Sequence, residues 1–241
     1  MQLIIDVGNT RVKTAVFDGD EMKEVHSFVL EDFIQEIGTF AGNFPIKKSI
    51  ISSVGKLSEE QARSVQLRFP TVILSQNTPL PFNNDYGTPE TLGVDRIALV
   101  AAFAKAYQKK GGLIIDVGTC ITYDFITSEN VYKGGAISPG LRLRYESLHN
   151  LTANLPLLTL ETPNSLVGDS TVNAIHSGVV NGVVSEIDGI IDTYREEFNI
   201  ETFVMTGGDA EFLSKRLKNS IFAHSNFLLE GLNYILTQRN D

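Results

Sequence analysis

The stretch LIIDVG occurs twice in this chain, at residues 3–8 and again at residues 113–118. Each copy is a short apolar run that ends in aspartate, valine and glycine, a pattern typical of a buried strand closed by a turn. The residues that follow differ, because the first copy continues NTRVKTAVF and the second continues TCITYDFIT. Each continuation predicts a second strand, so the same strand-turn-strand unit opens two halves of the chain.

Outward from each copy, the sequence predicts strands that alternate with helices. In the first half we expect helices over 31–41, from Ser58 (where Gln61 completes a capping box) and over roughly 90–109, and strands at 2–5, 11–17, 22–29, 49–53 and 71–74. The second half predicts helices over 170–197, 209–217 and 226–238, and strands at 113–116, 121–127, from 131 and at 203–208. Two similar halves of this kind predict an α/β protein with domains at 1–110 and 111–241 and a ligand cleft between them.

The composition is that of a globular protein with an acidic balance. The 241 residues are 42% hydrophobic, which is enough to bury a sizeable core. A formal charge of −9 disfavours a broad surface for nucleic acid or anionic membrane. No apolar run approaches the roughly 20 residues that span a bilayer, and the single cysteine, Cys120, fits a reducing compartment. We therefore expect a cytoplasmic protein that binds neither nucleic acid nor membrane.

The turn after the first copy has the residue types of an anion site. Gly8 lets the backbone approach a ligand, and successive N–H groups in a tight turn form a concave anion site. Further donors come from the side chains of Asn9, Thr10, Arg11 and Lys13. Asp6 would repel a phosphate, but it suits a bound Mg²⁺ or its water shell. A nucleotide phosphate site is one interpretation and a plain hairpin with a polar turn is the other; the matched second copy favours the first.

The turn after the second copy keeps the aspartate, as Asp116, but loses the positive charge. Thr119 and Cys120 replace the Asn-Thr pair, and Tyr123 replaces the lysine. This turn predicts a cation site, or a contact of Thr119 with a terminal phosphate. The two common phosphate motifs, G-x-x-x-x-G-K-[ST] and G-x-G-x-x-G, are absent. We expect the duplicated unit to have specialised, with the first turn as the main phosphate site.

Asp95 lies on an apolar helical face in ETLGVDRIALV (90–100). Leu92 and Leu99 share that face, and a carboxylate is costly to bury unless it is used or paired. One interpretation places Asp95 in a first helical turn, where the helix dipole favours an acid. The other makes it the general base of a phosphoryl transfer, with Arg96 as anchor for an acidic substrate.

The predicted helix over 171–191 has an apolar face formed by Val172, Ile175, Val179, Val183, Ile187 and Ile190. Gly178 and Gly182 on this helix permit a close neighbour. The face either packs on the core of its own chain or forms a dimer interface.

Five motifs, taken in order, resemble the type III pantothenate kinase family. They are DVGNTRVK (6–13), YGTPETLGVDR (86–96), DVGTCITYD (116–124), GGAISPG (134–140) and VGDST (167–171). The family belongs to the superfamily of acetate and sugar kinases, actin and chaperone ATPases. The resemblance therefore implies two duplicated ribonuclease-H-like α/β domains of the actin-like ATPase fold. Cys120 and Asp169 depart from the usual residue types of the family, at positions without a catalytic role.

The resemblance implies ATP-dependent phosphorylation of pantothenate to 4′-phosphopantothenate, the first step of coenzyme A biosynthesis. It implies a homodimer that uses Mg²⁺ and a monovalent cation, K⁺ or NH₄⁺. It assigns the ATP phosphates to Asp6, Val7, Gly8, Asn9, Thr10, Arg11, Val12, Lys13 and Thr119, and the monovalent cation to Asp116. It assigns pantothenate to Tyr86, Gly93, Val94, Asp95, Arg96 and Thr171, with Asp95 as proton acceptor.

Two other functions remain open from the sequence. One is a related kinase that acts on another hydroxy acid or sugar. The other is a non-catalytic nucleotide-binding regulator, similar to a transcriptional accessory factor. The acids Asp6, Asp95 and Asp116 disfavour the regulator, because a regulator needs no general base.

Overall fold

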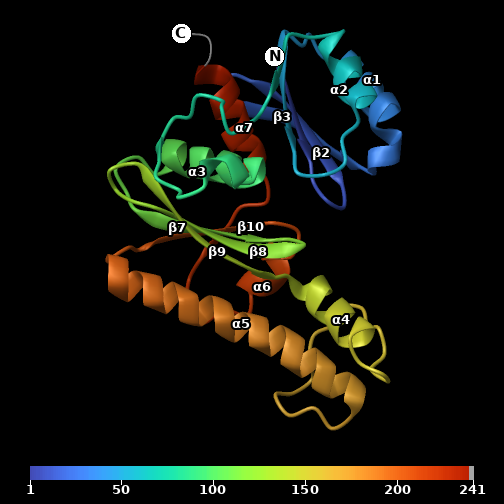
Figure 1. Ribbon diagram of the computed structural model, residues 1–241, viewed down its shortest axis with the longest axis vertical. Coiled ribbons are helices and arrows are strands. Elements are labelled where there is room, and N and C mark those ends of the chain that lie inside the picture. The colour runs from blue at the N-terminus through green and yellow to red at the C-terminus, as the bar shows by residue number, and fades with distance from the viewer. Residues whose placement is uncertain (239–241) are drawn as a thin grey trace. The chain divides into compact units, whose positions relative to one another are not determined.

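A computed structural model describes residues 1–238, and the chain divides into two compact units (Figure 1). Unit 1 holds Met1–Lys109, Asn130–Lys133 and the described residues from Asn226 on. Unit 2 holds Lys110–Glu129 and Gly134–Ser225. The units therefore differ from the expected ranges, 1–110 and 111–241, in two segments that pack with unit 1.

The first unit is built on a five-stranded mixed sheet of order β3-β2-β1-β4-β5. Its strands are β1 (Gln2–Val7), β2 (Val12–Asp18), β3 (Glu21–Phe28), β4 (Lys48–Ser53) and β5 (Thr71–Ile73). The strand β1 runs antiparallel to β2 and parallel to β4. The expected hairpin after β2 is confirmed, since Gly19 has a φ of 61° that suits its turn.

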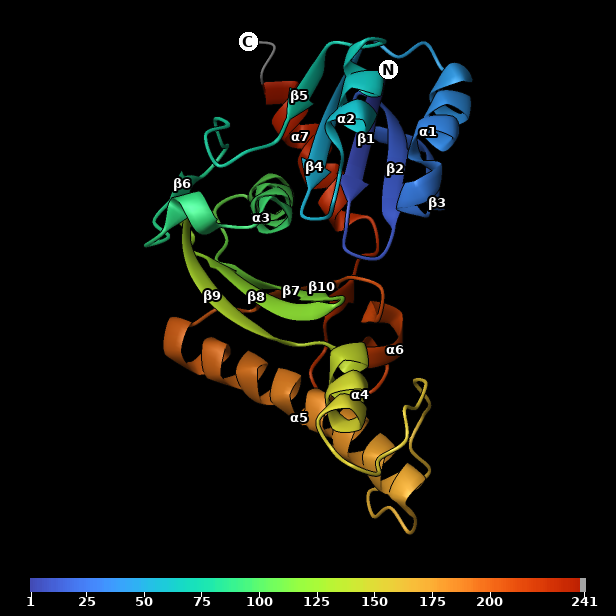
Figure 2. The same ribbon diagram turned by 45° about the vertical axis from the view of Figure 1, so that its right-hand side comes forward.

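Helices cover both faces of this sheet (Figure 2). They are α1 (Phe33–Gly42), α2 (Glu59–Gln66), α3 (Val94–Ala106) and α7 (Phe227–Gln238), with short 3₁₀ turns at Leu30–Asp32 and Pro89–Thr91. Leu3, Ile5 and Val7 pack in one core cluster with the buried face of α1. The opposite face carries α7, which contacts β1 and β4 and packs against α3. The expected capping box of α2 is confirmed by reciprocal hydrogen bonds between Ser58 and Gln61.

A single glycine permits the close packing of α7 on α3. A Cβ atom added to Gly231 would overlap the carbonyl oxygen of Ala98 and lie 2.8 Å from its carbonyl carbon. We expect Gly231→Ala to push the helices apart and lower the free energy of unfolding by about 1–3 kcal/mol. Gly42→Ala in α1 is the control, because its Cβ would meet no described atom within 4 Å. Urea unfolding compares the two, and equal midpoints would contradict this packing.

The second unit repeats the strand-turn-strand opening. Five of the six strands of its sheet have the order β11-β10-β7-β8-β9, with β7 antiparallel to β8 and parallel to β10. The strands are β7 (Gly112–Val117), β8 (Cys120–Ile126), β9 (Val131–Pro139), β10 (Thr202–Thr206) and β11 (Phe222–Ala223). The helices are α4 (Leu141–Asn150), α5 (Thr171–Phe198) and α6 (Ala210–Ser214). Figure 1 shows α5 running along one face of the sheet.

The apolar face of α5 packs inside its own unit. Val179, Val183 and Ile187 are buried in a cluster with Leu113 and Ile115 of β7. These side chains therefore pack in the core of their own chain, and they do not support a dimer interface.

Several elements differ from the expected ones. The helix α4 was not predicted, because only Leu141 and Tyr145 of its ten residues are buried and its apolar pattern is weak. The short strand β6 (Asn83–Asn84) lies in the expected loop and pairs with the start of β9. The helix α3 begins at Val94, later than expected, because Pro89–Thr91 forms a 3₁₀ turn. In the described part of the chain, no helix has the length and apolar character to cross a membrane.

Candidate functional site

The first turn joins β1 to β2 through residues 8–11 and is held from one side by the chain after β4. The amide of Gly8 donates to the carbonyl oxygen of Arg11 at 3.1 Å. The amides of Val54 and Gly55 both donate to Val7 O, at 3.1 and 3.2 Å. A Cβ on Gly55 would lie 2.7 Å from Gly8 O, so this close approach requires glycine. The turn is thus fixed in shape, while Asn9 and Thr10 remain exposed.

The side chain of Arg11, an expected phosphate donor, bonds to β3. Its Nε donates to Ser27 Oγ and its Nη2 donates to Ser27 O, both at 3.0 Å. An arginine has five N–H donors, so a phosphate contact from Arg11 must use the others. Lys13 lies on β2 directly opposite Asp6 in the strand register.

The carboxylate of Asp6 occupies an unusual environment at the end of β1. Its Oδ1 is buried and has no hydrogen-bond partner among the residues that the structure describes. Burial, and secondly the charge of Asp95, raises the pKa of Asp6 to about 7, although Ser52 and Lys13 act to lower it. Ser52 Oγ beside it is also buried and has no other hydrogen-bond partner among the described residues. A buried oxygen without a donor fits Mg²⁺, a hard cation that prefers oxygen ligands.

Asp95 lies in the first turn of α3, a helix whose N-cap is Gly93. Its Oδ1 accepts a hydrogen bond from the amide of Arg96 at 2.8 Å, which satisfies one of the unpaired donors of a helix start. A Cβ on Gly93 would overlap this carboxylate oxygen, so a larger residue here would displace the Asp95 side chain. Burial raises the pKa of Asp95, while the amide and charge of Arg96 oppose the rise. The structure therefore brings Asp6 and Asp95 close enough for their charges to interact within unit 1.

The predicted substrate residues Tyr86 and Arg96 also meet. The guanidinium carbon of Arg96 lies 5.6 Å from the ring centroid of Tyr86, and Arg96 is only 5% exposed. Tyr86 stacks on the buried ring of Tyr132, with centroids 6.0 Å apart and ring planes 25° apart. Arg96 is thus held over a stack of two aromatic rings.

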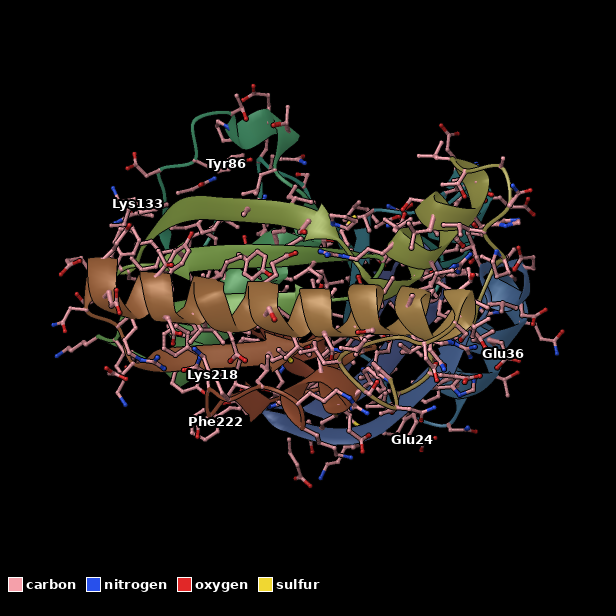
Figure 3. All side chains as sticks on the ribbon, turned by 90° about the horizontal axis from the view of Figure 1, so that it is seen from below. Glu24, Glu36, Tyr86, Lys133, Lys218 and Phe222 are labelled. Carbon is pink, nitrogen blue, oxygen red and sulfur yellow. The ribbon has the colours of Figure 1, made fainter. Side chains whose placement is uncertain are left out.

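Tyr132 was missed by sequence reasoning. It comes from the start of β9, where Asn84 pairs with Tyr132 and Lys133 forms an ion pair with Asp85 at 2.6 Å. Figure 3 labels Tyr86 and Lys133 on these two neighbouring segments. The only sequence signal was its position just before the GGAISPG motif.

The second turn is one residue shorter than the first. Val117 pairs with Ile121, whereas Val7 pairs with Val12 across the longer turn. The residue opposite Asp116 is consequently Thr122. Equating Tyr123 with Lys13 was therefore wrong, and the hydroxyl of Tyr123 instead donates to Glu186 Oε1 at 3.0 Å.

Asp116 lies against the glycine turn that follows β10. A Cβ on Gly207 would overlap Asp116 Oδ1 and lie 2.5 Å from Val117 O, and its φ of +98° also favours glycine. Asp209 donates its amide to Val117 O at 3.0 Å, and burial raises the pKa of its carboxyl group. Among the described residues, no group of three or more His, Cys, Asp or Glu side chains could hold a metal. A cation at Asp116 would therefore need backbone oxygens or water.

Thr171, an expected pantothenate residue, is the first residue of α5. The helix is capped by Ser170, whose Oγ accepts from the amide of Asn173 at 3.2 Å. Thr171 is exposed and lines a pocket of about 630 Å³ in unit 2. Arg144 is the charged residue of the lining, and the others are mainly apolar or small and include Leu148, Leu155, Ala174, Gly178 and Val179.

Solved structures with the same fold confirm the expected fold class. A Campylobacter jejuni protein assigned to the Baf family of transcriptional activators superposes with a TM-score of 0.63 at 20% identity, over 98% of both chains. A glucokinase from an Antarctic psychrotroph has a TM-score of 0.53 at 11% identity, over 98% of both chains. Each unit is an α/β domain with a mixed sheet, as in duplicated actin-like ATPases.

Sequence comparison is more specific. The family model for type III pantothenate kinase matches residues 2–193. The type III pantothenate kinase of Flavobacterium johnsoniae is 52% identical over 233 residues, which cover 96% of each chain. That of Christiangramia forsetii is 51% identical over 237 residues, covering 98% of each chain. With a family match over most of its length and half its residues identical to those of such relatives, the chain belongs to the type III pantothenate kinase family.

Proposed function

We propose that this chain transfers the γ-phosphoryl group of ATP to the primary hydroxyl of pantothenate, with Asp95 as general base. Family membership makes the chain a pantothenate kinase of coenzyme A biosynthesis, with pantothenate and ATP as substrates. The observation that carries the assignment of residues is the pair Asp6 and Asp95, whose charges interact in unit 1. The carboxylate of Asp6 has a buried oxygen without a hydrogen-bond donor among the described residues, and that of Asp95 is held by the amide of Arg96.

The phosphate side of the reaction is assigned to the first turn. The backbone of Val7, Gly8 and Val12, with the side chains of Asn9, Thr10, Arg11 and Lys13, would contact the ATP phosphates, and Thr119 is a further ATP contact. Asp6 would hold Mg²⁺ directly or through water. When bound, Mg²⁺ neutralises the negative charge that builds up on the phosphates during transfer. The rigid backbone around Gly8 supports this role, because phosphoryl transfer depends mainly on positioning and charge stabilisation.

The acceptor side is assigned to the first turn of α3. Arg96 would bind the carboxylate of pantothenate, and Gly93 and Val94 would line the same pocket with Tyr86. Asp95 would accept the hydroxyl proton while the hydroxyl oxygen attacks the γ-phosphorus and ADP leaves. Burial raises the pKa of Asp95, which makes it a stronger base than an exposed aspartate. The amide of Arg96 holds one carboxylate oxygen, so the carboxylate is oriented before the substrate arrives.

A panel of acceptors tests this function. ADP release would be measured with pantothenate, with pantothenol (which lacks the carboxylate), with N-acetylmannosamine and with glucose. We expect turnover with pantothenate, weaker turnover with pantothenol, and none with the sugars. In Arg96→Met the preference for pantothenate over pantothenol should disappear. Turnover of a sugar would indicate the related kinase, and ATP binding without turnover would indicate the regulator.

We further propose that Asp116 takes part in a monovalent cation site. The carboxylate lies beside the tight turn at Gly207, where carbonyl oxygens such as Val117 O are close. We expect activity in K⁺ or NH₄⁺ to exceed activity in Na⁺ at constant ionic strength. Asp116→Asn should remove this difference. Equal rates of the wild type in all three salts would contradict the proposal.

We also propose that the chain works as a homodimer through α5, with Thr171 near the interface. Gly178, Gly182 and Gly189 lie on one exposed stripe of this helix, because they are four and seven residues apart. A Cβ at any of them would meet no described atom within 4 Å, so the stripe has room for a closely packed second helix.

Light scattering tests the dimer. We expect a dimer mass for the wild type and a shift toward monomer in Gly182→Arg. Gly42→Arg, at a glycine of unit 1 that also has open space among the described atoms, is the control and should stay dimeric. A wild-type monomer at working concentration would remove the idea.

A further inference from the structure

We propose that Arg144 is a positioning residue for the Gly118–Thr119 turn, and that Glu186 and Tyr123 hold Arg144 in place. The inference rests on the proposed function in one respect, the assignment of Thr119 to ATP. All of the residues involved lie in unit 2.

Arg144 makes three side-chain contacts from α4. Its Nη2 donates to Glu186 Oε2 on α5 at 2.5 Å and to Ser138 Oγ at 3.0 Å. Its Nε donates to Pro139 O at 2.9 Å. The planar guanidinium therefore bridges α5 and the end of β9, which a single-point cation such as lysine cannot reproduce.

Glu186 is fixed from its other side as well. Its Oε1 accepts from the hydroxyl of Tyr123, a residue of β8 with no exposed surface. The side chains of Arg144 and Glu186 are 22% and 25% exposed, so the pair is more shielded from water than an ordinary surface ion pair. Burial acts to raise the pKa of Glu186, but hydrogen bonds from Arg144 and Ser138 outweigh it and leave the pKa below its usual value. The pair is thus charged at neutral pH.

The segment that Arg144 holds lies directly against the second turn. The amide of Gly140 donates to Thr119 O at 3.1 Å. A Cβ on Gly140 would overlap Gly118 O and lie 2.6 Å from Thr119 O, so the two backbones touch. Because Ser138 and Pro139 adjoin Gly140, a shift of this segment must move the Gly118–Thr119 turn.

A purely structural role for the pair makes a different prediction. A bridge that only joins α4 to α5 would change thermal stability and leave the affinity for ATP unchanged. A positioning role changes ATP affinity while the Michaelis constant for pantothenate stays the same. The second pair on α4, Arg142 with Glu146 at 2.7 Å, is the matched control, because Arg142 is 69% exposed and Glu146 belongs to the same helix.

The experiment measures the dissociation constant of ATP by titration calorimetry without pantothenate, and the two Michaelis constants in the kinase assay. Arg144→Gln and Glu186→Gln should weaken ATP binding about tenfold, as expected for the loss of charge-assisted hydrogen bonds. Glu186→Gln, whose residue does not line the pocket beside Thr171, should leave the Michaelis constant for pantothenate within about twofold, well below that tenfold change. Arg144→Lys should have an intermediate ATP affinity, because lysine keeps the positive charge but lacks the planar guanidinium with its several donors. Arg142→Gln should behave as the wild type.

Unchanged ATP affinity in folded Glu186→Gln and Arg144→Lys would overturn the inference, and so would an equal loss in Arg142→Gln. These conservative variants decide the matter if Arg144→Gln does not fold. Since ATP binding is measured without turnover, the outcome is independent of the acceptor. A wild type that binds ATP but does not phosphorylate pantothenate would refute the proposed function, while the comparison of variants would still test Arg144.

Discussion

Replacing Asp95 with asparagine is expected to lower kcat for pantothenate by about 10²–10⁴-fold, the usual loss when a general base is removed. Asparagine keeps the shape of the side chain and can still accept the hydrogen bond that Arg96 donates to Oδ1. The start of α3 should therefore stay intact, and the binding of ATP and pantothenate should change much less than kcat. Some activity should survive, because positioning and charge stabilisation supply much of phosphoryl-transfer catalysis.

The pH profile adds a second readout for Asp95. The base must be ionised to accept a proton, so activity should fall as the pH falls through its pKa. Burial raises this pKa above the ordinary value of 3.8, so the acid limb should lie above that of an exposed carboxylate. Because Asp6 and Asp95 interact, the limb reports on the pair as a unit. In Asp95→Asn, the residual activity should depend less on pH over this acid range, because the ionisation of Asp95 no longer contributes.

The alternative role of Asp95 predicts a different outcome. A residue whose only role is a favourable interaction with the helix dipole contributes less than about 1 kcal/mol of stability and nothing to kcat. Steady-state kinetics and thermal melts of Asp95→Asn separate the two roles. A folded variant with kcat within about threefold of the wild type, far less than general-base loss, would refute the catalytic assignment.

Replacing Asp6 with asparagine is expected to have two large effects of opposite sign. Activity should fall by about 10²-fold or more, because the ligand for Mg²⁺ is lost. The ligand-free protein should become more stable at pH 8. The pKa of Asp6 rises from 3.8 to about 7 on folding, so the folded state holds a proton that the unfolded state releases. This favourable contribution is complete below pH 3.8 and is lost as the pH rises through about 7.

The size of the stabilisation follows from the shift. One pKa unit corresponds to about 1.4 kcal/mol, so the rise from 3.8 to about 7 sets an upper limit of about 4 kcal/mol. Solvent relaxation around a partly buried group reduces this, and we expect a gain of about 1–3 kcal/mol at pH 8 and almost none at pH 4.

Urea unfolding at the two pH values checks the Asp6 prediction. Asp18→Asn, an exposed aspartate at the other end of β2, is the control and should change stability by less than about 0.5 kcal/mol. Added Mg²⁺ and ATP should stabilise the wild type more than Asp6→Asn, because the ionised carboxylate of Asp6 binds Mg²⁺ and asparagine binds it less well. If Asp6→Asn were instead less stable than the wild type at pH 8, the ionised carboxylate of Asp6 would have stabilising partners in the folded protein, and the prediction would be wrong.

The repeated strand-turn-strand unit could be predicted because its signals are local. Apolar runs, a glycine and polar turn residues lie within about a dozen positions in each copy, and both hairpins are confirmed. The length of each turn could not be predicted. Because the second turn is one residue shorter, Thr122 and not Tyr123 takes the position opposite Asp116 that Lys13 has opposite Asp6. Strand register depends on tertiary packing, which sequence spacing does not reveal.

The contacts that support the candidate site come from distant parts of the chain. Tyr132 stacks on Tyr86, and Arg144 pairs with Glu186 on another helix. No periodicity or motif in the sequence indicates either contact, because the two partners are far apart in the chain and meet only when it folds. The same holds for α7, which packs with unit 1 at Gly231 although it follows the second half in sequence. Single residues with local chemistry, such as Asp6 and Asp95, could be named as candidates from the sequence, whereas their supporting contacts could not.

Transfer of label from ATP that carries a labelled γ-phosphate tests the central claim most directly. The purified chain would be incubated with Mg²⁺, K⁺ and pantothenate, and the products would be separated and identified by mass. We predict that the label appears in phosphopantothenate in step with ADP formation, and that Asp95→Asn slows this transfer by the factor expected for a lost general base. Label that appears only in inorganic phosphate or in another acceptor, with pantothenate unchanged, would contradict the account.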